Sequence, residues 1–288
     1  NPFARFGATG EAGVNFSQLF VTPALAWKLG EHQSVGIAAN FIYQEFEAKG
    51  LGFFAGFSSD PAHVSDQGKD RTTGASVRVG WQGQFGDVLT LGASWQSRGN
   101  TSGFNDYSGL FADRGGFDVP ETWVLGAAVK AGDKLTFAAD VQEILYSDVP
   151  TVGNSVASLF GGKPLGSSNG PGFGWKDIQV VKVAALYQAT PKLLLRAGYS
   201  KSDQPVQAGE TFFNILAPGV IEQHVTLGAT WAVNEKSALS LAYAKGLEET
   251  VSGANSIPPG FPPGGFGSGN ANVHLSAESL GIAWQRKF

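Results

Sequence analysis

The chain has 288 residues, of which 40 are glycine, 12% are aromatic and only 15% are charged, an unusual composition for a soluble globular protein. Its formal net charge is −4 and its lysines and arginines are scattered, so it contains no basic patch of the kind that binds nucleic acid. The absence of cysteine excludes disulfides, thiol catalysis and metal sites with cysteine ligands.

No part of the sequence is apolar over the roughly 20 residues that a membrane-spanning helix requires. The densest apolar run, VVKVAALY at 180–187, is short and contains Lys182. A helical membrane protein is therefore excluded. The chain begins at Asn1 and contains no methionine, so we expect it to be a processed or truncated product.

The predicted elements are β-strands, because apolar and polar residues alternate along most of the chain. In the stretch 225–233, for example, Val225, Leu227 and Trp231 share one face, while Thr226 and Thr230 lie on the other. We expect about eleven strands of roughly 10 to 15 residues each. They begin near residues 18, 33, 72, 87, 121, 134, 177, 192, 220, 237 and 272.

Short and long connections alternate between these strands. Five short polar turns are predicted at 29–33, 85–87, 131–134, 189–192 and 234–236. Five long segments rich in Gly, Pro, Asn and Ser lie at about 48–71, 99–120, 147–176, 203–220 and 250–271. We interpret the proline-rich stretch PPGFPPGGFGSG at 258–269, within the last of them, as a surface loop.

Long strands with short turns at one end and long loops at the other are typical of a transmembrane antiparallel β-barrel. Strands of a soluble β-sandwich are shorter, usually ~5 to 6 residues. Because only closed barrels and helices satisfy all backbone polar groups in lipid, alternation without helices implies closure. Five charged residues fall on or near the expected lumen face: Arg78, Arg98, Asp140, Lys182 and Arg196. The lipid face is expected to carry Val77, Val79, Trp81, Leu91, Trp95, Trp123, Leu125 and Val183.

The aromatic residues near strand ends fit the two interfacial belts of such a barrel. Trp27, Trp81, Tyr187, Trp231 and Trp284 belong to this set. The last predicted strand ends on Phe288, and we expect it to run toward the periplasmic side, where the short turns lie. Eleven is an odd number, whereas bacterial single-chain barrels have even numbers, so we expect further strands upstream.

No motif for catalysis or metal binding is present. The four histidines, at positions 32, 63, 224 and 274, show no metal-ligand spacing, and there is no G-x-S-x-G elbow. We therefore predict no catalytic residue, no metal and no cofactor, and a protein that is not an enzyme. A membrane-embedded hydrolase that uses a serine of the lumen or the rim remains a rival hypothesis.

The long loops carry large apolar side chains that a solvated loop would avoid. The first contains Leu51, Phe53, Phe54 and Phe57, and the second Leu110, Phe111 and Phe117. The third contains Leu159, Phe160, Leu165 and Phe173, and the fourth Phe212, Phe213, Ile215 and Leu216. These residues either pack on each other as a cap or bind a hydrophobic ligand, and the two interpretations are compatible.

Four long segments of the chain are distinctive: GLGFFAGFSSDPAHV at 50–64, YSGLFADRGGFDVPETW at 107–123, GFGWKDIQVVKVAALYQATPKLLLRAGYSKSDQPV at 172–206 and FNILAPGVIEQHVTLGATW at 213–231. They resemble a known family, the long-chain fatty acid and hydrocarbon transporters of the bacterial outer membrane (FadL/TodX-like). The resemblance implies a fourteen-stranded monomeric barrel with an N-terminal plug. The strands here would be the fourth to the fourteenth, so residues 1–288 would form one barrel domain that lacks the plug and the first strands.

The resemblance also implies passive uptake of long-chain fatty acids or related hydrocarbons, with outer-membrane lipid around the barrel. The family's apolar groove corresponds to the loops that carry Leu51, Phe53, Phe54, Phe57, Leu110, Phe111 and Phe117, to which we add Phe160. Arg98 and Lys182 on the inner face are predicted either to meet a carboxylate headgroup or to form ion pairs between strands. A general diffusion porin, or a surface receptor with capped loops, is the alternative.

Overall fold

The computed structural model describes residues 3–4, 8, 10–257 and 268–286. Among these residues, no helix has the length and the apolar character needed to cross a bilayer. Phe288 and all but the last two residues of the proline-rich stretch at 258–269 lie outside the described residues.

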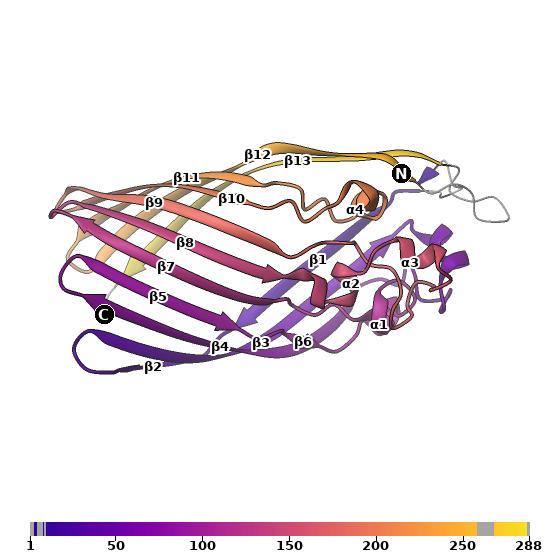
Figure 1. The fold of residues 1–288 in the computed structure, drawn as a ribbon, viewed down its shortest axis with the longest axis horizontal. Helices are drawn as coiled ribbons and strands as arrows, with labels where there is room; N and C mark the ends of the chain where they lie inside the picture. Colours follow the sequence, from indigo (N-terminus) through magenta and orange to yellow (C-terminus); the bar gives the residue numbers. More distant parts are fainter. Residues whose placement is uncertain (1–2, 5–7, 9, 258–267, 287–288) are drawn as a thin grey trace.

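Within the described residues, thirteen β-strands form one antiparallel sheet (Figure 1). Their bounds are β1 Gly13–Val21, β2 Ala24–Lys28, β3 Gln33–Lys49, β4 Asp70–Phe85, β5 Leu89–Gln96, β6 Asn100–Thr101, β7 Glu121–Ala131, β8 Leu135–Leu145, β9 Ile178–Thr190, β10 Leu193–Ser202, β11 Gln223–Asn234, β12 Ser237–Ile257 and β13 Gly269–Arg286. Neighbours in the sheet follow the order β1-β3-β4-β5-β7-β8-β9-β10-β11-β12-β13. Consecutive strands along this path therefore pair as hairpins or across a long loop.

The thirteen described strands occupy eleven positions along this path, because two of the positions are each filled by a strand that is interrupted. β1 and β2 both pair with β3, and Pro23 lies between them, where its missing N–H ends the hydrogen-bond ladder. β5 and the short β6 both pair with β4. The eleven predicted strands are thus confirmed, although the first one begins at Gly13 and not near residue 18.

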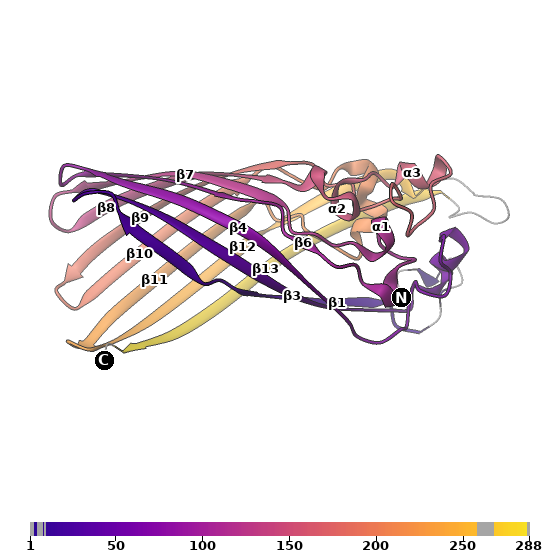
Figure 2. The same cartoon turned by 90° about the horizontal axis from the view of Figure 1, so that it is seen from below.

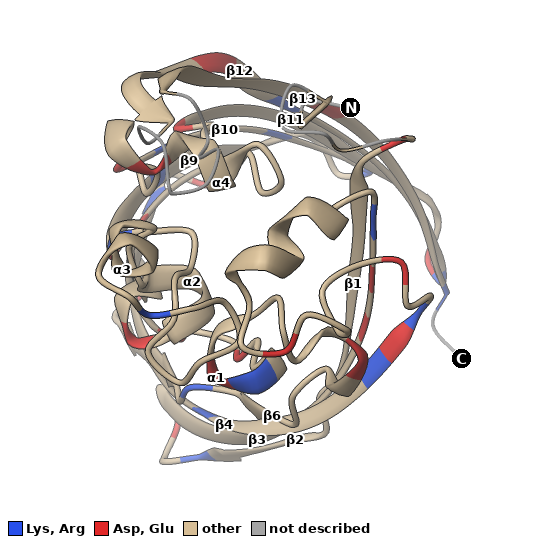
Figure 3. Cartoon of the chain, turned by 90° about the vertical axis from the view of Figure 1, so that its right-hand side faces the viewer, with Lys and Arg blue, Asp and Glu red and all other residues tan. Residues whose placement is uncertain are grey.

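All five predicted short turns are present at one end of the sheet (Figures 1 and 2). The long connections gather at the opposite end, where they contain short helices. These are η2 Gly52–Phe57, η3 Asn105–Tyr107, α1 Ala112–Gly115, η4 Tyr146–Asp148, α2 Pro150–Gly153, α3 Ala157–Phe160, η5 Ala208–Glu210 and α4 Thr211–Asn214. Viewed from this end, the sheet curves around the loop segments (Figure 3).

The last long loop is shorter than the sequence predicted. β12 and β13 continue to pair from Val251↔Val273 to Ile257↔Gly269, so most of 250–257 and 269–271 is strand and not loop. Val273 is buried in a small apolar cluster with Val206 and Val220 of the neighbouring connection. This packing stabilises the outer part of the hairpin, which therefore extends well into the predicted loop.

The two faces of the sheet separate as the alternation predicts. On β3, Asn40, Ile42, Gln44 and Phe46 are buried on the inner face, whereas Phe41 between them is 56% exposed. Six of the eight residues predicted on the lipid face are exposed, and Trp81 and Leu91 are half-buried on the same face. The outer face is thus an apolar belt, as a membrane-spanning sheet requires.

Candidate functional site

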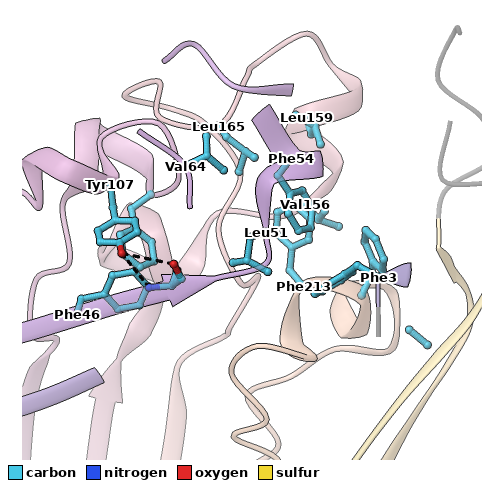
Figure 4. Close-up of a cluster of buried hydrophobic side chains, with 14 of the residues drawn as sticks. Phe3, Phe46, Leu51, Phe54, Val64, Tyr107, Val156, Leu159, Leu165 and Phe213 are labelled. Atoms are coloured by element: carbon cyan, nitrogen blue, oxygen red, sulfur yellow. Dashed lines mark hydrogen bonds between the residues drawn. The ribbon is translucent and has the colours of Figure 1, made fainter. Parts of the chain in front are cut away.

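Most of the apolar residues of the loops form one buried cluster at the loop end of the sheet. Its fully buried members include Leu51 and Phe54 from the first long loop, and Tyr107 and Phe111 from the second. Figure 4 shows Tyr107 packed against Phe46, which the end of β3 contributes, and Leu51 and Phe54 close to Phe213 of α4. The loops therefore pack around a shared core and are not separately exposed to solvent.

Aromatic rings make up much of this cluster. The ring centroid of Phe46 lies 4.7 Å from that of Phe111 and 4.8 Å from that of Tyr107. Phe111 and Phe117 are 5.2 Å apart, and Phe54 and Phe213 are 5.6 Å apart. These separations lie within the ~4.5–7 Å range of favourable ring pairs, and all four pairs are edge-on. The cap interpretation of the loop residues is thus realised in the structure.

Buried hydrogen bonds fix the second loop against β3. The hydroxyl of Tyr107 donates to the carbonyl of Gly68 at 2.5 Å and accepts from the amide of Ala48 at 3.1 Å. Burial raises the pKa of the Tyr107 phenol above its ordinary value, so the group stays neutral. Figure 4 shows the tyrosine hydroxyl directed at the backbone of this strand end.

A second set of contacts joins the first and second loops on their outer side. The Nδ1 atom of His63 lies 2.8 Å from a carboxylate oxygen of Asp60, and the same oxygen accepts from the hydroxyl of Ser108. These hydrogen bonds, that of His63 first, lower the pKa of Asp60 below its ordinary value. Gly109 completes the contact: a Cβ there would lie 2.0 Å from the carbonyl oxygen of Asp60, so the close approach of the loops requires glycine.

Inside the cluster lies a cavity of about 230 Å³. It is lined by residues of β1, β3 and four of the long loops. The lining residues are Val14, Phe16, Phe46, Phe54, Leu110, Phe111, Phe117, Thr151, Leu165, Pro171, Gly172, Phe173, Phe213, Leu216 and Ala217. Among these described residues, Thr151 alone has a polar side chain, and its hydroxyl donates to the carbonyl of Gly116. The cavity wall is therefore apolar, and its one polar side chain already has a hydrogen-bond partner.

The eight predicted apolar site residues all belong to this cluster, but only half of them reach the cavity. Phe54, Leu110, Phe111 and Phe117 line it. The other four pack behind that wall: Leu51, Phe53, Phe57 and Phe160. The structure thus brings the predicted residues together and divides them into lining and supporting groups.

The two predicted cations lie away from the cavity lining. Arg98 donates to the carboxylate of Asp118 at 2.8 Å and to the carbonyl of Asp148 at 2.6 Å, which ties the second loop to the third. Lys182 lies on the inner face of β9, where its Nζ donates to the amide oxygen of Gln142 at 2.5 Å. Contact between either cation and a ligand headgroup stays a prediction.

Sequence reasoning missed the contribution of two strands to the cavity. Phe16 of β1 and Phe46 of β3 are register partners, and the ring centroid of Phe16 lies 4.6 Å from that of Phe117. The length of the alternating stretch was the available signal: β3 has 17 residues, and a strand crosses a bilayer in about 9 to 11. The surplus residues project above the membrane and form one side of the cavity.

The described residues contain no group of three or more His, Asp or Glu side chains that could hold a metal ion. What the site can do is hold an apolar molecule. A model of the family described as "Outer membrane protein transport protein (OMPP1/FadL/TodX)" matches residues 7–288. No curated protein matches the chain.

Several solved structures share the fold at low sequence identity. A deltaS2S3 mutant of the TodX monoaromatic hydrocarbon channel has a TM-score of 0.67 and 16% identity, over 96% of this chain and 71% of that one. A Pseudomonas aeruginosa FadL homologue has a TM-score of 0.64 and 14% identity, over 94% and 67%. The CymD monoaromatic hydrocarbon channel has a TM-score of 0.58 and 14% identity, over 98% and 77%.

Proposed function

This chain belongs to the outer membrane protein transport protein family (OMPP1/FadL/TodX), and on that premise we propose that it takes up long-chain fatty acids or related hydrophobic compounds by passive diffusion. The family consists of outer-membrane channels for hydrophobic compounds and is not an enzyme class. The protein is accordingly an outer-membrane transport β-barrel. The proposal concerns the ligand and where it is captured.

The apolar cavity is the observation that carries the proposal. A void of roughly 150 Å³ in an apolar core can hold a benzene-sized molecule, so about 230 Å³ accepts one aromatic ring or a segment of an alkyl chain. Each buried methylene contributes about 0.8 kcal/mol. Six methylenes would therefore contribute about 5 kcal/mol before the loss of ligand freedom is counted.

A monoaromatic hydrocarbon is the second candidate ligand. Four phenylalanine rings, Phe16, Phe46, Phe111 and Phe117, lie together on one side of the cavity. Such a wall favours a flat ring through edge-on and offset contacts. The names of two similar structures, both monoaromatic hydrocarbon channels, support this candidate.

We further propose that the protein works as a monomer surrounded by outer-membrane lipid, and that residues 1–288 belong to a single barrel domain. The exposed apolar residues of the outer face support contact with lipid: Trp231 is 52% exposed, Leu125 54% and Trp284 61%. A general diffusion porin or a capped surface receptor remains the alternative. A low small-solute conductance in planar bilayers would favour the hydrophobic channel, because the packed loops obstruct the outer end of the sheet.

Uptake by whole cells tests the proposal. Cells that lack their own transporter for hydrophobic compounds would express the full-length protein and receive labelled oleate or labelled toluene. We expect saturable uptake of at least one of them. With the protein shown to be folded in the outer membrane, no uptake of either compound above that of empty cells would contradict the proposal.

A further inference from the structure

One buried polar atom beneath the cavity has no hydrogen-bond partner. The side chain of Gln44 on the inner face of β3 is fully buried, and its Nε2 donates to the carbonyl of Phe117 at 3.0 Å. Within the described part of the chain, its Oε1 has no partner. A buried acceptor without a partner costs free energy, so such an atom requires an explanation.

The orientation of the amide is fixed by its surroundings. Rotating the amide by 180° would place Oε1 against the carbonyl oxygen of Phe117, and two acceptors cannot bond to each other. The unpartnered atom is therefore the oxygen, and the missing partner is a hydrogen-bond donor.

Other buried polar side chains of the same interior are satisfied. Asn40, which lies two inner-face positions before Gln44 on β3, donates to the hydroxyl of Ser76 at 2.9 Å and to Gln96 at 3.2 Å. It also accepts from the hydroxyl of Thr22 at 2.9 Å. The free oxygen of Gln44 is thus a local feature and does not reflect a loosely arranged polar interior.

Gln44 lies next to the aromatic side of the cavity. Phe46 is the next inner-face residue on β3, and Phe16 is its register partner on β1. Phe117, whose carbonyl binds the Gln44 amide, provides the third ring. All three rings line the cavity, so Gln44 lies behind them, between the apolar cavity and the Asn40 network.

We propose that Oε1 of Gln44 accepts a hydrogen bond from a neutral donor at the polar end of the ligand, the hydroxyl of a phenol or an aliphatic alcohol. The apolar body of the ligand occupies the cavity. Its hydroxyl reaches Oε1 when the rings of Phe16 and Phe46, which are in edge-on contact with their centroids 6.3 Å apart, turn aside. The inference rests on the proposed function, because the ligand must first enter the cavity.

The same geometry disfavours a carboxylate at this position. An ionised carboxylate has acceptor oxygens alone and therefore cannot donate the hydrogen bond that Oε1 of Gln44 lacks. A hydrocarbon leaves Oε1 unpartnered. The site therefore prefers a hydroxylated ligand to a hydrocarbon of the same shape and to the corresponding carboxylate.

Equilibrium binding to the purified full-length protein in detergent tests this inference. The probes are p-cresol, toluene and p-toluate, each corrected for partition into empty micelles. We expect p-cresol to bind about threefold to tenfold more tightly than toluene, the gain from one hydrogen bond, and p-toluate to bind more weakly than p-cresol.

Three variants test whether the side-chain amide of Gln44 causes the preference for p-cresol over toluene. Gln44→Leu should abolish the preference for p-cresol and retain toluene binding, and the retained binding also shows that the variant is folded. Gln44→Glu, which keeps the size of the side chain, should also change the ratio of the two affinities. Gln18→Leu removes the register partner of Gln44 on β1 and should leave the ratio unchanged.

The outcomes separate this inference from the proposed function. Binding of neither p-cresol nor toluene would overturn the proposed function. Equal affinities for the two in the wild-type protein, as expected if a water molecule satisfies Oε1, would overturn only the inference. The inference is also overturned if Gln44→Leu keeps the preference, or if Gln18→Leu alone removes it.

Discussion

Replacing Phe111 by alanine should weaken ligand binding at the cavity without affecting the sheet. The Phe111 side chain is 6% exposed, lines the cavity and packs edge-on against the rings of Phe46 and Phe117. If its ring covers about 40 Å² of a bound ligand, its loss removes about 1 kcal/mol at 25 cal/mol per Å², roughly a fivefold rise in Kd. The emptied space also destabilises the packed loops, by ~3–5 kcal/mol for a phenylalanine truncated in a core.

The control is the same substitution on the lipid face. Phe137 of β8 is 51% exposed and does not line the cavity, so Phe137→Ala should leave the Kd unchanged. Both variants would be titrated with toluene in detergent, and their folding compared by near-UV and far-UV circular dichroism. An unchanged Kd in Phe111→Ala, or an equal loss in Phe137→Ala, would refute the assignment of the binding site.

Three further predictions follow from the contacts around the cavity. The pKa of Asp60 in the folded protein lies below its ordinary value of 3.8, so its hydrogen bonds with His63 and Ser108 stabilise the loops above pH 3.8 and are lost as the pH falls through the folded pKa. Limited proteolysis of the loops should therefore become faster in acid. The acceleration should be smaller in Asp60→Asn. Tyr107→Phe removes both hydrogen bonds of the hydroxyl and should destabilise the second loop by about 1–3 kcal/mol, measured by amide hydrogen exchange; unchanged protection would contradict this. Arg98→Gln or Lys182→Gln should lower the affinity for oleate but not for toluene if that cation meets a carboxylate, and equal effects on both ligands would point to a structural role.

The strands and turns could be predicted from the sequence because their signals are local. Alternation fixes which side chains share a face, as for Val225, Leu227 and Trp231 on β11, and short polar runs mark the turns. The extension of the first strand to Gly13 could not be predicted. In the first half of this strand the alternation is reversed, with apolar Val14 and Phe16 on the inner face and polar Asn15 and Ser17 on the outer face, so that pairing with β3 decides the outcome.

The candidate site was predictable in composition but not in geometry. Large apolar residues in loops indicated Phe54, Leu110 and Phe111 as binding residues. Which of these residues line a cavity and which support it depends on contacts between loops far apart in sequence. The sequence does not distinguish Phe46 from other inner-face strand residues. Its place in the cavity wall depends on the packing of the loops against the end of β3.

Photo-crosslinking with a fatty acid that carries a diazirine on its alkyl chain tests the central claim most directly. The protein would be irradiated with the probe in outer-membrane preparations, and the labelled peptides identified by mass spectrometry. The account predicts that labels concentrate at residues 110–117 and 211–217, and that excess oleate or toluene removes them. Labels confined to the exposed outer faces of the strands, and insensitive to competitor, would contradict it.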